Sequence, residues 1–88
     1  MDVRRTIGWN LRRLRVDRGL SQERLALEAE IDRSYVGRVE RGRENVTVAT
    51  LEAFAKVLSV SVSELFADID PKDARPQSLR SGRKRKVS

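Results

Sequence analysis

The chain has 88 residues, of which 39% are hydrophobic and 36% are charged, and its net charge is +6. This length predicts one domain with a small core, and the sequence contains no cysteine and no histidine. Disulfides and thiolate metal sites are therefore excluded, and the commonest general base is missing. We expect no catalytic residue, no metal site and no cofactor.

The distribution of charge constrains any nucleic-acid-binding surface. Residues 1–70 contain 12 basic and 12 acidic side chains, whereas residues 71–88 contain 7 basic and 1 acidic. A binding surface in the first 70 residues would therefore be a local patch. No apolar run approaches the ~20 residues that a membrane span needs, and the N-terminus lacks the apolar stretch of a signal peptide. We expect a cytoplasmic protein.

Apolar periodicity predicts five short helices and no strand, so the fold class is all-α. The helices are expected at roughly residues 3–18, 21–29, 32–41, 47–58 and 61–66. The residues expected to face the core are Ile7, Leu11, Leu14, Leu25, Ala26, Ala29, Val36, Val39, Leu51, Phe54, Ala55 and Leu58. Trp9 lies off this pattern, which indicates either a half-buried aromatic or a subunit contact.

Capping residues set the ends of these helices. Gly19 is expected to end the first helix in a left-handed conformation, and Gly42 is expected to end the third helix. The expected N-caps are Ser21, Asp32, Thr47 and Ser61, the last forming a capping box with Glu64. The expected domain covers residues 1–68. Residues 69–88 have two prolines and few apolar side chains, which predicts a flexible, disordered basic tail.

The second and third helices are short and only a few residues separate them, as in a helix-turn-helix. The DNA major groove is ~12 Å wide and admits one such helix, whose first residues face the base edges. Arg33, Ser34 and Arg38 would lie together near the start of the third helix. The alternative for the arginines is a solvated basic surface. Gly37, unfavourable within a helix, indicates a close approach to its backbone.

Three segments within residues 7–66 resemble the Cro/cI-type helix-turn-helix domains, also called the xenobiotic-response-element family. They are IGWNLRRLRVDRGLSQERLA, IDRSYVGRVERGRENVT and TLEAFAKVLSVSVSELF. The resemblance implies a compact five-helix lambda-repressor-like domain that binds double-stranded DNA. One position departs from the family pattern, because Glu30 stands where the turn usually has glycine. Glutamate disfavours the left-handed conformation, so a different or strained turn is expected.

The resemblance also implies roles for individual residues. Arg33, Ser34 and Arg38 would read bases, and Arg15 would form an internal salt bridge with Glu40. The residues implied to contact the DNA backbone are Ser21, Gln22, Tyr35, Arg41, Arg43 and Asn45. For Tyr35 a thymine methyl is the alternative contact, and Arg43 and Asn45 are also typical loop residues. A homodimer interface is implied at Val62, Leu65 and Phe66, of which some are expected to pack into the core and the rest to face the second subunit.

The expected function is sequence-specific transcriptional regulation, as a repressor or autoregulator, by a homodimer on a near-palindromic operator. The alternative is an antitoxin-type interaction module that covers a protein partner, with DNA binding secondary. The basic run GRKRK near the C-terminus is compatible with phosphate neutralisation, with a solvated end, or with a localisation signal.

Overall fold

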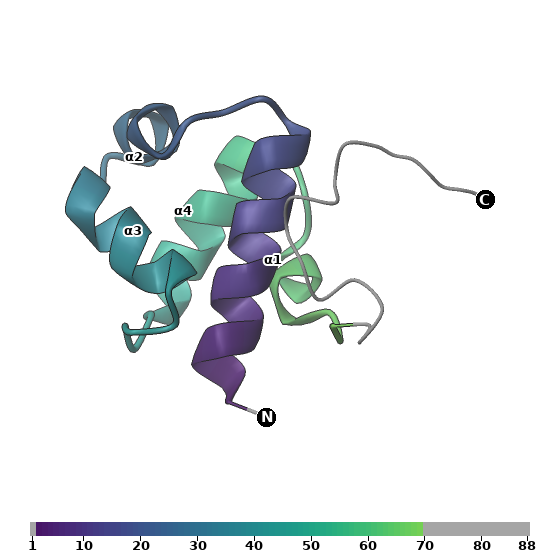
Figure 1. The fold of residues 1–88 in the computed structure, drawn as a ribbon. Helices are drawn as coiled ribbons and strands as arrows, with labels where there is room; N and C mark the ends of the chain where they lie inside the picture. Colours follow the sequence, from purple (N-terminus) through teal and green to yellow (C-terminus); the bar gives the residue numbers. More distant parts are fainter. Residues whose placement is uncertain (1, 70–88) are drawn as a thin grey trace.

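The computed structural model describes residues 2–69, and it is all-helical over that range (Figure 1). Its elements are α1 (Val3–Asp17), α2 (Gln22–Ala29), α3 (Arg33–Glu40), α4 (Val48–Leu58) and the short 3₁₀-helix η1 (Val62–Phe66). The all-α prediction and the helix-turn-helix of α2 and α3 are confirmed. None of these helices is long and apolar enough to cross a membrane. The predicted tail lies, apart from residue 69, outside the described residues.

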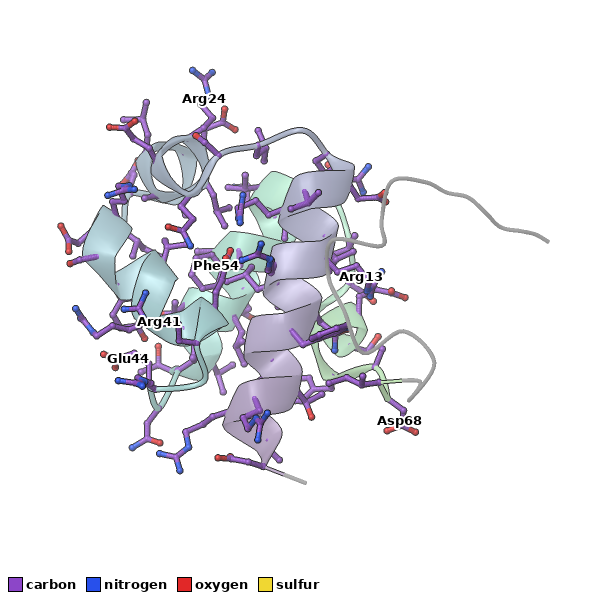
Figure 2. The ribbon with its side chains drawn as sticks, viewed as in Figure 1. Arg13, Arg24, Arg41, Glu44, Phe54 and Asp68 are labelled. Carbon is purple, nitrogen blue, oxygen red and sulfur yellow. The ribbon has the colours of Figure 1, made fainter. Side chains whose placement is uncertain are left out.

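One core joins all five elements. Phe54 of α4 is fully buried and lies at the centre of the molecule (Figure 2). The predicted core residues are buried, except Ala29, which is partly buried against the same cluster. Leu65 of η1 is also fully buried. This last contact fixes η1 against α1 and α4, and so completes the core at the end opposite α3 (Figure 1).

The fifth helix differs from the prediction. It is a 3₁₀-helix and the Ser61–Glu64 capping box is wrong, because the Ser61 side chain makes no capping hydrogen bond. The Glu64 N–H instead donates to the Ser61 carbonyl at 3.0 Å, and the Ser61 hydroxyl lies 2.8 Å from that of Ser63. A bond between residues three apart is typical of a 3₁₀ turn. A five-residue segment has little room for a regular α-helix.

All four α-helices end in the same way, with one residue in the left-handed conformation. These residues are Gly19, Glu30, Gly42 and Ser59, with φ of 70°, 59°, 74° and 57°. In each case the next N–H donates to the carbonyl five residues back, at 2.9–3.0 Å, as in a Schellman motif. Glu30 therefore keeps the conformation that glycine favours, and its strain costs about 1–2 kcal/mol.

A close backbone contact sets the position of α3 on α1. A Cβ at Gly8 would lie 2.3 Å from the Val39 carbonyl oxygen and 2.8 Å from that of Glu40. Only glycine permits this approach, because both neighbours are backbone atoms that cannot turn aside. The helix that presents the candidate DNA-reading residues is thus seated directly on the backbone of α1.

Gly8→Ala should lower the free energy of unfolding by about 1–3 kcal/mol, because the added methyl must separate α1 from α3. Gly37→Ala is the matched control, since its Cβ would meet only side-chain ends, the closest being Arg41 Nη1 at 3.3 Å. It should change stability by less than about 1 kcal/mol, because alanine favours the helix. Urea denaturation measures both variants, and equal stabilities would contradict the contact.

Candidate nucleic-acid interface

A buried ion pair holds α3 in place. The Glu40 side chain, only 3% exposed, accepts hydrogen bonds from Arg15 Nε at 2.6 Å and from Arg15 Nη2 at 3.0 Å. Arg15 Nη1 also donates to the Leu20 carbonyl at 2.8 Å, and Gln22 Nε2 donates to Glu40 at 3.0 Å. The predicted Arg15–Glu40 pair is confirmed. This cluster joins α1, the loop before α2, the start of α2 and the end of α3.

The start of α2 lies beside this cluster. The Ser21 hydroxyl accepts from the Arg24 backbone N–H at 2.9 Å, so Ser21 is an N-cap as predicted. Gln22 is half-buried, and its amide nitrogen donates to Glu40. The first N–H groups of a helix have no partner within the helix and favour an anion. The structure therefore positions Gln22 through Glu40 at a helix end suited to phosphate.

The outer surface of α3 contains the candidate base-reading residues. Arg33 and Ser34 are exposed, and the side chain of Arg38 is 43% exposed. Arg38 Nη1 lies 3.5 Å from the Ser34 hydroxyl, so these two side chains share one surface as predicted. The Ser34 hydroxyl donates to the Asp32 carboxylate and holds the pKa of that carboxyl below its ordinary value. Asp32 stands at the N-cap position of α3 as predicted, but its side chain makes no capping hydrogen bond.

Arg38 has an intramolecular partner that the sequence did not indicate. Its Nε donates to Glu44 Oε2 at 2.5 Å, and its guanidinium carbon lies 5.7 Å from the centre of the Tyr35 ring. Figure 2 shows Glu44 just beyond the C-terminal end of α3, on the opposite side of the molecule from Asp68. Gly42 turns the chain back along α3, where the Arg43 N–H donates to the Arg38 carbonyl at 2.9 Å. The sequence indicates the contact of Glu44 with Arg38 only if Gly42 is recognised as a turn that brings the chain back beside α3.

The candidate backbone contacts lie around this surface. Arg41, Arg43 and Asn45 are exposed, and Asn45 Oδ1 lies 3.5 Å from Arg4 Nη1 of α1. Arg4 therefore joins the surface from α1, which sequence reasoning missed. Tyr35 is half-buried against the core. A Cβ at Gly37 would meet only the side-chain ends of Arg41 and Gln22, so the close approach to its backbone that the sequence indicated is not found within the described residues.

The candidate subunit contacts differ in exposure. Phe66 is 44% exposed and Val62 is half-buried, but Leu65 is fully buried in the core of its own chain. Leu65 therefore has no exposed surface for a second subunit. Asn10, which sequence reasoning missed, is buried and donates through Nδ2 to the carbonyls of Leu65 and Ala67 at 3.1 and 2.9 Å. Trp9, on the neighbouring position, is half-buried.

Comparison with known proteins gives consistent matches. Residues 11–65 match the helix-turn-helix family. The chain is 40% identical to an uncharacterized HTH-type transcriptional regulator, y4dJ, of Sinorhizobium fredii, over 91% of this chain and all of that protein. It is 43% identical to control protein C.SmaI of Serratia marcescens, over 75% of this chain and 79% of that protein. The crystal structure of the restriction-modification controller protein C.AhdI from Aeromonas hydrophila aligns with a TM-score of 0.70 and 46% identity, over 72% of this chain and 96% of that chain.

Glu40→Ala should lower the free energy of unfolding by about 3–5 kcal/mol, because it leaves the Arg15 charge buried without its partner. Such a loss is a large fraction of the about 5–15 kcal/mol by which native proteins are stable. Thermal and urea denaturation followed by circular dichroism measure it. The exposed Glu52→Ala is the control and should change stability by less than about 0.5 kcal/mol. A similar small effect for both variants would show that the buried pair does not hold the fold.

Proposed function

The chain belongs to the Cro/cI-type helix-turn-helix family of DNA-binding transcriptional regulators, and we propose that it binds a near-palindromic operator as a homodimer. In this proposal it acts as a repressor or an autoregulator of transcription. The observation that carries the proposal is the outer surface of α3, where three polar or basic side chains project from a helix whose other side is buried in the core. A helix fixed in this way can enter the major groove without unfolding or rotating.

Each part of the surface has a separate proposed role. Arg33, Ser34 and Arg38 read base edges, since arginine pairs with the acceptors of guanine and serine accepts or donates. The residues proposed to contact the phosphates and so set the position of α3 are Ser21, Gln22, Tyr35, Arg41, Arg43 and Asn45. The location of these residues supports this role, because they come from both ends of the helix-turn-helix and surround the base-reading residues.

The proposed homodimer uses the η1 end of the molecule. Phe66 and Val62 offer apolar surface there, while Leu65 supports them from the core. Two copies of α3 would then enter successive major grooves about 34–36 Å apart. Residues 1–68 would form the DNA-binding domain, and the basic residues of 69–88 would add phosphate contacts. The antitoxin-type alternative is not favoured, because the matched proteins are named as regulators and controller proteins.

Arg38→Ala tests base reading. It should weaken binding to the preferred operator by about 1–3 kcal/mol and relax the preference at one base pair. Fluorescence anisotropy on operators changed at each position measures the effect. Lys56→Ala removes the same charge from an exposed position on α4 and should leave the base preference intact. A uniform loss across all operators would assign Arg38 to phosphate contact instead.

Phe66→Asp tests the subunit contact. A carboxylate in an apolar interface should weaken the dimer by about 2 kcal/mol, or about 30-fold in its dissociation constant. Sedimentation velocity over a dilution series measures this shift. Leu27→Asp introduces the same charge at an exposed leucine of α2 and should leave the dimer unchanged. An equal effect of both variants, or a wild-type monomer, would exclude the η1 interface.

A further inference from the structure

The ion pair between Arg38 and Glu44 lies directly on the surface proposed to meet DNA. Glu44 is a carboxylate, and DNA presents phosphates, so its place there needs a physical reason. We infer that Glu44 is a positioning residue that determines specificity: it fixes which nitrogens Arg38 offers to a base and weakens binding to sequences without the matching base. This inference rests on the proposed function and extends it to a residue outside the set assigned above.

The geometry limits what Arg38 can present. Its Nε is occupied by Glu44 at 2.5 Å, and Nη1 lies 3.5 Å from the Ser34 hydroxyl. The Tyr35 ring lies beside the guanidinium, with 5.7 Å from the ring centre to the guanidinium carbon. Arginine has five N–H donors. The Nε donor is directed at Glu44 and one Nη1 donor at Ser34, which leaves the other donors of Nη1 and Nη2 for a base. These two nitrogens match the paired acceptors O6 and N7 of guanine. We therefore assign guanine as the base that Arg38 reads.

Holding Arg38 in this orientation favours base reading over phosphate contact. A long side chain that is already ordered loses less conformational freedom when it binds. The Glu44 carboxylate, 24% exposed, also offsets the charge of Arg38. Attraction to phosphates, which every DNA sequence offers, is therefore weakened. The bidentate contact to guanine depends mainly on the orientation of the two nitrogens, so Glu44 weakens it less than it weakens the attraction to phosphates. Specificity arises here from a group that disfavours the wrong partners.

A purely structural role for Glu44 makes a different prediction. In that case the ion pair would only hold residues 43–46 against α3, and its loss would lower stability and weaken binding to all sequences alike. A role in specificity changes the ratio between sequences. The ratio of affinities is therefore the readout that separates the two, and the salt dependence of binding provides a second one.

The experiment uses the full chain and an operator selected by the wild-type protein from a pool of random duplexes. Affinities are measured at several salt concentrations for that operator, for operators changed at each base pair, and for a random duplex. Glu44→Gln removes the charge. Its random-duplex affinity should rise, and its slope of log affinity against log salt should steepen by up to about 0.9. Discrimination at the base pair read by Arg38 should fall by about fivefold, the lower end of one base contact.

Two further variants separate charge from position. Glu44→Asp keeps the charge but shortens the side chain, so it should keep the salt slope and still lose discrimination. Asp17→Asn removes one exposed carboxylate from the last turn of α1 and should leave discrimination unchanged. In an Arg38→Ala background, Glu44→Gln should have no effect on that base pair, because the residue through which it acts is gone.

The outcomes distinguish the two proposals. If the wild-type chain selects no sequence, the proposed function fails and this inference fails with it. If the wild-type chain is selective and Glu44→Gln keeps full discrimination at the Arg38 base pair, the inference alone fails. A loss of discrimination in Glu44→Gln that also occurs without Arg38 would overturn it as well, since Glu44 would then act through another route.

Discussion

The buried ion pair between Arg15 and Glu40 is the constraint on which the rest of the structure depends. It connects α1 to the end of α3, and Gln22 adds the start of α2 to the same carboxylate. Burying a charge is costly unless it stays paired, so α2 and α3 cannot change their angle without breaking this cluster. The Gly8 contact removes the remaining freedom, because α3 already touches the backbone of α1. The outer surface of α3 is therefore presented in one orientation.

Local patterns predicted most of the fold. Apolar spacing placed the core residues, and the glycines at 19 and 42 marked helix ends that the structure confirms. Glu30 is the informative exception, since it takes a conformation that its own preference opposes while the next N–H, of Ile31, donates to the Ala26 carbonyl. Two predicted side-chain caps did not form, because Asp32 and Ser61 each bond to a serine two residues later. A short polar side chain at a helix start has several nearby partners, and sequence spacing alone does not choose among them.

The candidate site was also predictable only in part, because sequence spacing does not determine which partner a polar side chain contacts. Exposure of Arg33 and Ser34 follows from helical spacing, because the core residues fix which side faces inward. Glu44 and Asn10 were missed, since their partners depend on a chain reversal and on a contact between residues 55 apart. The sequence leaves open which of Val62, Leu65 and Phe66 pack into the core, and the structure places Leu65 there. Apolar residues at the end of a domain serve either the core or an interface, and only packing decides between them.

The amide of Asn10 has a consequence beyond the core. It attaches η1 to α1, and η1 and α3 lie on opposite sides of α1 (Figure 1). In the proposed dimer, a small tilt of η1 would become a large displacement of α3 at the other side of each protomer. In that proposal, the spacing between the two half-sites would depend on how firmly these two hydrogen bonds hold η1 to α1, although Asn10 itself is buried in the core.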